Sequence, residues 1–311
     1  MQTNAIVIDG YGDSSKFRDQ MIDIPELKPK QLLIKVAGSS VTPFDIAVRE
    51  GVFKNDFALD MPAITGTDVV GKVVDIGSAI EGYNIGDTVC GMIGVKGFGA
   101  YSDYAILGQS KAAKVADNIP VEVAAALPMT SIPAYNALFD LGQLKSGEKV
   151  LIHGGAGGVG SMAIQLANNI GATVYTTASD LNAKALKQLG ASRVIDYHTE
   201  KFEEELSDLD LVIDTVGHYT YKNSFEVLKK NGRLVSLVEE PDDRLAAKYQ
   251  VDAMYLSGKF DNPLSKVVKL VSDGKVKLNV QQTYPLTVVG VKDAQDYYED
   301  NHVFGKVVLL K

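Results

Sequence analysis

The N-terminal part of the chain, up to about residue 118, alternates short apolar or β-branched runs with glycine, aspartate and proline. Apolar runs of about four to eight residues between turn-forming residues predict β-strands. The strands expected in this way cover residues 32–36, 69–76, 88–92 and 104–107. We therefore expect a twisted, mostly antiparallel β domain in this part of the chain.

The pattern changes between about residue 120 and residue 258, where strand patterns alternate with helix patterns. The expected strands are 149–153, 172–177, 193–197, 210–216, 232–238 and 253–258. The expected helices are 158–169, 181–189, 200–206, a helix that ends at 230, and 242–249. Strands that alternate with helices predict an α/β fold with a doubly wound parallel sheet.

The remaining segment is too short for a third domain. It predicts a helix over 263–272, another around 293–298, and a closing strand over 306–310. We expect this segment to complete the first domain. The predicted division is therefore 1–119 for the first domain, 120–258 for the parallel sheet, and 259–311 for the return to the first domain.

The most informative motif is the GAGGVG sequence of residues 155–160, which follows an apolar strand and opens a helix. In a dinucleotide-binding turn, Gly155 allows the tight bend, Gly157 lets backbone N–H groups approach a pyrophosphate, and Gly160 lets the helix pack on the strand. Six consecutive residues are thus expected to bind cofactor: Gly155, Ala156, Gly157, Gly158, Val159 and Gly160. A purely structural glycine turn is the alternative, and the flanking strand and helix favour the nucleotide.

Composition narrows the class of protein. The chain has 311 residues, 46% of them hydrophobic, and a net charge of -8, without a basic run interleaved with aromatic residues. Nucleic acid is therefore not expected as a partner. A single cysteine, Cys90, excludes an internal disulfide, and no apolar run approaches the roughly 20 residues of a membrane-spanning helix. We expect a cytoplasmic protein that binds small molecules and does not bind membranes.

Several segments in fixed order resemble the medium-chain dehydrogenase/reductase superfamily, in its zinc-independent quinone oxidoreductase branch. They are VAGSSVTPFD (36–45), PAITGTDVVGKVVDIG (62–77), GDTV (86–89), GAYSDYA (99–105), AAALPMTSIPAYNAL (124–138), the glycine motif, LGASRVIDY (189–197) and FGKVVLL (304–310). The resemblance implies a GroES-like β-barrel catalytic domain, formed by both ends of the chain, with a Rossmann domain inserted. It also allows a homodimer.

The zinc ligands of the alcohol-dehydrogenase branch have no counterpart here. Thr42 and Thr67 occupy the positions of a Cys and a His ligand, and Met129 and Thr130 lie around the third. Asp68 alone resembles an acidic position of that set. Because a catalytic zinc site keeps three protein ligands, no metal is expected.

This lack of ligands constrains the chemistry. Hydride transfer to a simple ketone leaves an alkoxide, a strong base that needs a Lewis acid or a well-placed proton donor. Hydride transfer to a quinone, or to the β-carbon of an enone, leaves a much less basic anion. We therefore expect quinones or α,β-unsaturated carbonyl compounds as substrates, with the nicotinamide supplying the hydride.

The candidate catalytic residues are Thr42 and Asp45. Related quinone reductases usually carry Asn at the position of Thr42, so its hydroxyl is expected to bond either the substrate oxygen or the nicotinamide ribose, or else its own backbone. Asp45 either orients a water or the substrate, or caps the helix that follows. Thr130 resembles the family's contact to the nicotinamide, although Pro133 replaces a common Thr.

The choice between NADPH and NADH depends on the end of the second strand of the parallel sheet. Asp180 follows Gly160 at the distance of the usual ribose-binding acid, but by motif it starts the next helix. Ser179, Lys184 and Tyr197 resemble the groups that hold a 2′-phosphate, so NADPH is expected. Further cofactor contacts are expected from Val216, Gly217 and Leu237, at strand ends, and from Lys306 in the terminal segment.

The four histidines, His153, His198, His218 and His302, show no ligand spacing, and we expect each on the surface or bonded to backbone. Two functions remain open: an NADPH-dependent reductase of quinones or enones, and an NADPH-binding protein of the same family with little or no turnover.

Overall fold

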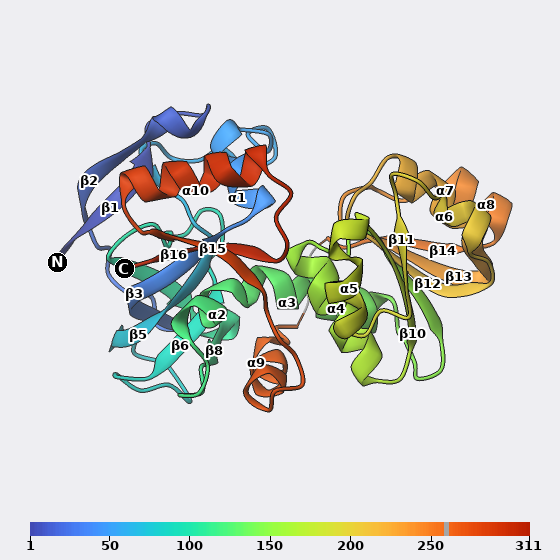
Figure 1. Cartoon of the computed structure of the whole chain (residues 1–311). Coiled ribbons are helices and arrows are strands. Elements are labelled where there is room, and N and C mark those ends of the chain that lie inside the picture. The colour runs from blue at the N-terminus through green and yellow to red at the C-terminus, as the bar shows by residue number, and fades with distance from the viewer. Residues whose placement is uncertain (258–260) are drawn as a thin grey trace. The chain divides into compact units, whose positions relative to one another are not determined.

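The computed structural model describes residues 1–257 and 261–311 and divides the chain into two compact units (Figure 1). The first unit contains Met1–Met129, Leu264–Asp273 and Leu278–Lys311, and the second contains Thr130–Pro263 and Gly274–Lys277. The expected domain boundary at residue 119 lies ten residues before the end of the first unit's N-terminal segment at Met129. The difference arises because α2 (Val121–Ala126) packs on strands of the first unit. The other expected boundary, at 258, falls outside the described residues.

The main sheet of the first unit combines strands from both ends of the chain. Its order is β15-β16-β3-β5-β6-β8, and β7 pairs with β3. The strands are β3 (Gln31–Val41), β5 (Asp68–Ile76), β6 (Thr88–Met92), β7 (Tyr104–Gly108), β8 (Ala112–Lys114), β15 (Val280–Pro285) and β16 (Lys306–Leu310). Only β15 and β16 pair in parallel among these strands, so the expectation of a mostly antiparallel domain is confirmed.

A second sheet and several helices complete this unit. The sheet has the order β2-β1-β4, with β1 (Gln2–Ile8), β2 (Phe17–Asp23) and β4 (Ala63–Ile64). Helix α1 (Pro43–Glu50) follows β3, α9 is Leu264–Ser272, and α10 (Val288–Asp300) packs on β15 and β16. An apolar core that includes Leu32, Val69 and Leu107 fills the space between these elements and so holds the end of β3 and the start of β5 in place.

The second unit is a parallel sheet with the order β11-β10-β9-β12-β13-β14. Its strands are β9 (Lys149–Ile152), β10 (Thr173–Ala178), β11 (Arg193–Asp196), β12 (Leu209–Asp214), β13 (Leu228–Ser236) and β14 (Asp252–Tyr255). Its helices include α3 (Pro128–Tyr135), α4 (Gly158–Asn169), α5 (Ala183–Gln188), α6 (Phe202–Glu205), α7 (Tyr219–Val227) and α8 (Asp243–Tyr249). The strand order reverses between β9 and β12, so the carboxyl ends of these two strands mark the expected ligand-binding edge.

Three expectations about the elements need correction. The helix expected to end at residue 230 ends at Val227, because Leu228 pairs with Leu209 and starts β13. Strands β1, β2 and β15 were not predicted, and α10 is longer than the expected 293–298 because Thr287 caps it by accepting a hydrogen bond from Gly290 N–H. Within the described part of the chain, no helix is long and apolar enough to cross a membrane.

Candidate functional site

The glycine motif forms the turn between β9 and α4. The residue with positive φ is Gly154, at +70°, so the tight bend expected at Gly155 lies one residue earlier. A Cβ on Gly155 would lie 2.1 Å from Thr176 Oγ1, and a Cβ on Gly160 would lie 2.2 Å from the Gly154 carbonyl oxygen. These two glycines therefore allow the close packing of the turn and of α4 against β9 and β10.

The start of α4 fits the pyrophosphate of a dinucleotide. Gly157 is the N-cap of the helix, and a Cβ there would meet no atom closer than 3.4 Å, so its lack of a side chain is not needed for packing. The first N–H groups of a helix have no partner within the helix, and the helix dipole favours an anion beside them. The glycine at this position thus leaves free the space that phosphates need.

The ends of β10 and β11 bring together the residues expected to read the ribose. Ala178 pairs with Asp196, so Ser179 and Tyr197 follow at neighbouring strand ends. Asp180 opens a short 3-10 turn and is exposed, as is Lys184. As the motif suggested, Asp180 thus lies beyond the strand end and starts the next helical segment.

Asp214 organises the same sheet edge at the end of β12. Its buried carboxylate accepts hydrogen bonds from Val216 N–H at 3.2 Å and from Gly217 N–H at 3.1 Å, and from the Ser236 hydroxyl at 3.1 Å. Leu237 N–H donates to the Asp214 carbonyl at 2.9 Å. The three residues expected to contact cofactor here therefore share one anchor, which the sequence analysis did not identify.

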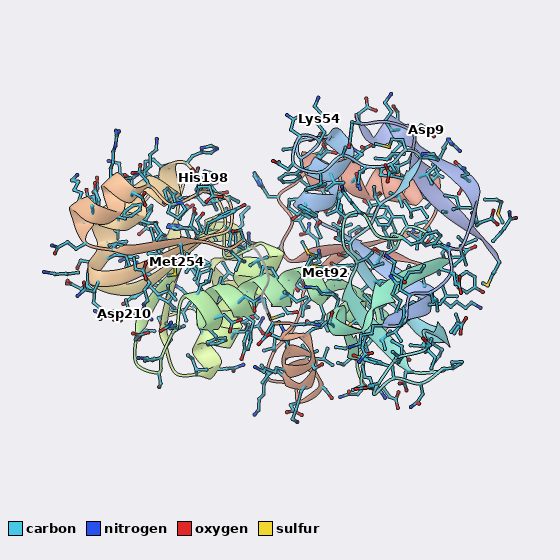
Figure 2. The ribbon with its side chains drawn as sticks, turned by 180° about the vertical axis from the view of Figure 1, so that it is seen from behind. Asp9, Lys54, Met92, His198, Asp210 and Met254 are labelled. Carbon is cyan, nitrogen blue, oxygen red and sulfur yellow. The ribbon has the colours of Figure 1, made fainter. Side chains whose placement is uncertain are left out.

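The structure contradicts the expectation that His153 lies on the surface or bonds to backbone. It is fully buried, and its ring nitrogens lie 3.1 Å from Thr177 Oγ1 and 3.1 Å from Ser224 Oγ, so it is neither on the surface nor bonded to backbone. Burial lowers the pKa of His153 to about 4, so the imidazole is neutral at neutral pH. His198, at the end of β11, is exposed (Figure 2), as are His218 and His302.

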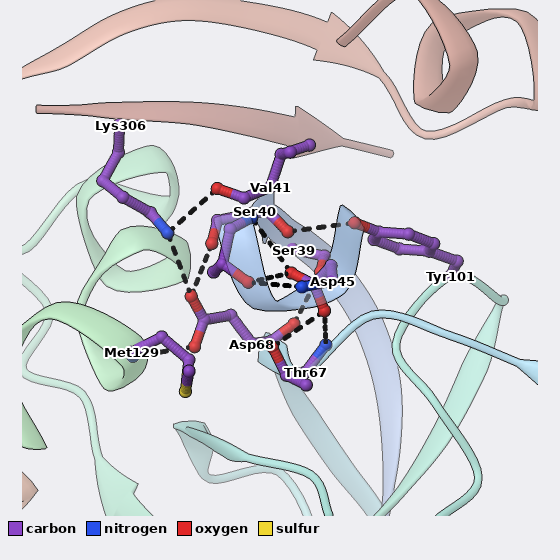
Figure 3. A network of polar contacts seen from close by, with 10 residues as sticks. Ser39, Ser40, Val41, Asp45, Thr67, Asp68, Tyr101, Met129 and Lys306 are labelled. Carbon is purple, nitrogen blue, oxygen red and sulfur yellow. Dashed lines mark hydrogen bonds and ion pairs between the residues drawn. The ribbon is translucent and has the colours of Figure 1, made fainter. Parts of the chain in front are cut away.

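The expected catalytic residues lie at the start of α1, and Figure 3 shows Asp45 among its polar partners. Thr42 is the N-cap: its Oγ1 accepts a hydrogen bond from Asp45 N–H at 2.9 Å and donates to Asp45 Oδ2 at 2.6 Å. The carboxylate also accepts the Thr42 N–H at 3.0 Å, which completes a capping box. Asp45 therefore caps the helix as its third residue, through the capping box, while Thr42 holds the N-cap position; a role of Asp45 in orienting water or substrate stays a prediction. The Thr42 hydroxyl bonds both the backbone and the carboxylate of Asp45, and its contact with the substrate or with the nicotinamide ribose stays a prediction.

The other oxygen of Asp45 binds Thr67. Thr67 N–H and Thr67 Oγ1 donate to Asp45 Oδ1 at 3.0 and 2.9 Å. The two threonines at the positions of zinc ligands in relatives therefore meet on one buried carboxylate. Sequence reasoning missed this partnership, although the spacing of Thr42 and Asp45 is that of a capping box with Asp in place of Glu.

Asp68 and Lys306 form a buried ion pair beside this group, with 3.5 Å between Lys306 Nζ and Asp68 Oδ2. Lys306 also donates to the Val41 carbonyl at 3.1 Å. Asp68 accepts hydrogen bonds from the Ser40 hydroxyl and, at 2.9 Å, from Met129 N–H. Lys306 was expected to bind cofactor; that contact stays a prediction, and the structure gives its ammonium group these two protein partners (Figure 3).

The buried groups have shifted pKa values. Burial, opposed by the Thr42 hydrogen bond and reinforced by Asp68, raises the pKa of Asp45 from 3.8 to about 6. Burial also raises the pKa of Asp68 and lowers that of Lys306, against the attraction of each for the other. The site contains the carboxyl groups of Asp45 and Asp68 and the ammonium group of Lys306. Protonation of Asp45 therefore leaves these three side chains with no net charge.

Among residues 1–257 and 261–311, no group of three or more His, Cys, Asp or Glu is placed to hold a metal ion. Thr130, the expected nicotinamide contact, is buried in α3. Cys90 is buried, and burial raises the pKa of its thiol.

Comparisons with known proteins agree with this architecture. Residues 28–117 match the alcohol dehydrogenase GroES-like domain, 189–309 match the family described as zinc-binding dehydrogenase, and 137–222 match the alanine dehydrogenase/PNT C-terminal domain. The predicted fold class, a GroES-like domain with a Rossmann sheet, is confirmed.

Two curated relatives and one solved structure are similar over most of their length. The chain is 35% identical to a 2-methylene-furan-3-one reductase of Solanum lycopersicum, over 93% of this chain and 74% of the relative. It is 33% identical to an NADPH-dependent alkenal/one oxidoreductase of Arabidopsis thaliana, over 99% of this chain and 79% of the relative. A quinone oxidoreductase structure from Coxiella burnetii matches with a TM-score of 0.91 and 33% identity, covering 100% of both chains. This protein belongs to the medium-chain dehydrogenase/reductase superfamily, in its quinone oxidoreductase branch.

Proposed function

We propose that this protein is an NADPH-dependent oxidoreductase that reduces quinones or α,β-unsaturated carbonyl compounds without zinc. The names of its relatives support the reaction: one reduces a 2-methylene-furan-3-one, one is an NADPH-dependent alkenal/one oxidoreductase, and one is a quinone oxidoreductase. When bound, NADPH supplies the hydride.

The observation that carries the zinc-free part of the proposal is the use of Thr42 and Thr67. Neither hydroxyl is a typical zinc ligand, and both donate to Asp45. A site without a Lewis acid suits substrates whose reduced anion is weakly basic. Simple ketones and alcohols are therefore poor substrates.

The cofactor is held by the second unit. The start of α4, Gly155 to Gly160, receives the pyrophosphate, because its N–H groups and the open space at Gly157 suit an anion. Ser179, Lys184 and Tyr197 bind the 2′-phosphate. Thr130, Val216, Gly217 and Leu237 contact the rest of the cofactor.

The test is the fall of NADPH absorbance when quinones, enals, saturated ketones or alcohols are added, before and after dialysis against a strong chelator. We expect turnover with the first two classes and no effect of the chelator. NADPH binding in a calorimeter without turnover of any acceptor would instead indicate the binding protein. One equivalent of zinc whose removal abolishes turnover would contradict the zinc-free mechanism.

A cytoplasmic location and a homodimer stay predictions, which cell fractionation and sedimentation would test.

A further inference from the structure

A small cavity lies beside Asp45 in the first unit. Its lining includes Ile64, Thr65, Gly66 and Thr67, which lead into β5, and Val95, which follows β6. It leaves about 10 Å³, which is room for one water molecule or one carbonyl oxygen. The cavity is therefore large enough for a single polar atom of a ligand, next to two hydroxyl groups and a carboxyl group.

Thr65 has a hydroxyl group that the fold does not use. Its side chain is buried, and Oγ1 has no hydrogen-bond partner among residues 1–257 and 261–311. A buried hydroxyl without a partner is unfavourable, and valine would fill the same space without that cost. Thr65 lines the cavity, so an acceptor atom placed there would give this hydroxyl its partner.

Thr67 links the cavity to Asp45. Its hydroxyl donates to Asp45 Oδ1 at 2.9 Å while the carboxyl group is ionised. Because burial raises the pKa of Asp45 to about 6, the carboxyl group takes up a proton as the pH falls through that value. The protonated carboxyl group can then donate to Thr67 Oγ1, and the Thr67 proton becomes free to point into the cavity.

We propose that the cavity receives the carbonyl oxygen of the substrate, that Thr67 protonates this oxygen with Asp45 as its proton source, and that Thr65 donates a hydrogen bond to it. The inference rests on the proposed function, since it assigns the proton step of that reaction. Thr67 and Thr65 become catalytic residues, and Thr42 holds the carboxyl group in place.

The proton count is balanced. Reduction of an enone by the nicotinamide hydride adds two electrons and one hydrogen to the β-carbon, and the negative charge collects on the carbonyl oxygen. The Thr67 O–H bond then breaks and a new O–H bond forms on the substrate. The Asp45 O–H bond breaks in turn and restores the Thr67 hydroxyl. Asp45 remains as a carboxylate, which solvent protonates before the next cycle, and the released enol tautomerises to the ketone.

The charges around Asp45 make this proton exchange feasible. Asp68 on β5 disfavours a second negative charge, and Lys306 on β16 partly offsets it. The Tyr101 phenol stays protonated, because burial raises its pKa. Arg49, further along α1, is paired with Glu299 of α10. Asp45 thus faces one carboxyl group and one ammonium group, and Lys306 offsets part of the repulsion from Asp68.

The test compares Thr67→Val with Thr67→Ser and with a control, Thr88→Val. Thr88 lies on β6 and does not line the cavity, and its hydroxyl accepts a hydrogen bond from Lys72 at 3.2 Å. We expect Thr67→Val to lower kcat by about 100-fold, the usual size of a general-acid contribution. Thr67→Ser should restore most of the rate, Thr88→Val should match the wild type, and NADPH affinity should be unchanged in all three.

The pH profile separates a catalytic role from a structural one. In the wild type, kcat/KM should fall as pH rises through about 6, the pKa of Asp45, because the relay needs its protonated form. Thr67→Val and Asp45→Asn should lose this limb. In the enzyme without cofactor, an infrared band of a protonated carboxyl group should titrate in the same range and be missing from Asp45→Asn.

These experiments distinguish a failure of the proton relay from a failure of the proposed function. A wild type that oxidises no NADPH with any acceptor contradicts the proposed function and the relay together. An active wild type whose Thr67→Val variant keeps its rate and pH profile overturns only the relay. Equal losses in Thr67→Val and Thr67→Ser, together with a lowered Tm in both, would show that Thr67 serves the fold, and would also overturn it.

Discussion

Replacing Lys306 with Met should destabilise the first unit strongly, because it leaves the Asp68 carboxylate buried without a counter-ion. The ammonium group lies 3.5 Å from Asp68 Oδ2, and the two side chains are 5% and 0% exposed. Breaking a buried pair in this way costs about 3–5 kcal/mol. At an unfolding entropy of about 2.1 cal/mol/K per residue, this loss corresponds to a fall in Tm of roughly 5–8 °C for a chain of 311 residues.

The shifted pKa values sharpen this prediction. Burial raises the pKa of Asp68 and lowers that of Lys306, so each group is driven toward its neutral form despite the other. The pair is therefore not a source of net stability, and removing both charges should be far milder than removing one. Lys306→Met combined with Asp68→Asn should be more stable than the sum of the single changes predicts, by about 1–3 kcal/mol.

The assay is urea unfolding followed by circular dichroism, with Lys114→Met as the matched control. Lys114 and Asp87 are closer, at 2.8 Å, but 49% and 23% exposed. An exposed pair contributes about 0–1 kcal/mol, so burial rather than distance should decide the result. If Lys306→Met costs no more than Lys114→Met, or if the double variant shows no coupling, the reasoning is refuted.

Three further predictions concern single sites. The folded-state pKa of Asp45 lies above its ordinary 3.8, at about 6, so the folded protein binds the extra proton and stability falls as pH rises between these values. Relative to Asp45→Asn, the free energy of unfolding of the wild type should fall by up to about 3 kcal/mol between pH 3.8 and about 6 and should not change further above that range. If urea unfolding shows the same pH dependence for both proteins, the pKa shift is contradicted. Gly160→Ala should lower the Tm, because its Cβ would lie 2.2 Å from a carbonyl oxygen, whereas Gly157→Ala should keep the Tm and weaken NADPH binding in calorimetry. The opposite pattern would place the pyrophosphate elsewhere. Lys184→Ala should weaken NADPH by about 10- to 150-fold and leave NADH unchanged, because one charge-assisted bond contributes about 1.5–3 kcal/mol; equal loss for both cofactors would remove Lys184 from phosphate recognition.

Much of the fold was predictable because its signals are local. The alternation of apolar strands and helices gave the parallel sheet, and the glycine motif gave its ligand-binding edge. Local signals failed where pairing decides the structure. Leu228 continues a helical pattern in sequence, yet it joins β13 because Leu209 offers it a partner in the sheet.

The candidate site was predictable in residue type but not in its connections. The absence of zinc ligands at Thr42 and Thr67 could be read from the sequence, whereas their meeting on Asp45 depends on the approach of α1 to β5. The pairing of Lys306 with Asp68 joins opposite ends of the chain, which no local pattern records. His153 was misjudged for the same reason, since Thr177 and Ser224 reach it from other elements.

The position of the transferred hydride tests the central claim most directly. The protein would be incubated with NADPH carrying deuterium at the transferable position and with an enone, and the product would be examined by NMR. The account predicts deuterium on the β-carbon of a saturated ketone, with the ketone left unreduced. Deuterium on the carbonyl carbon of an alcohol, or no transfer to any enone or quinone, would contradict it.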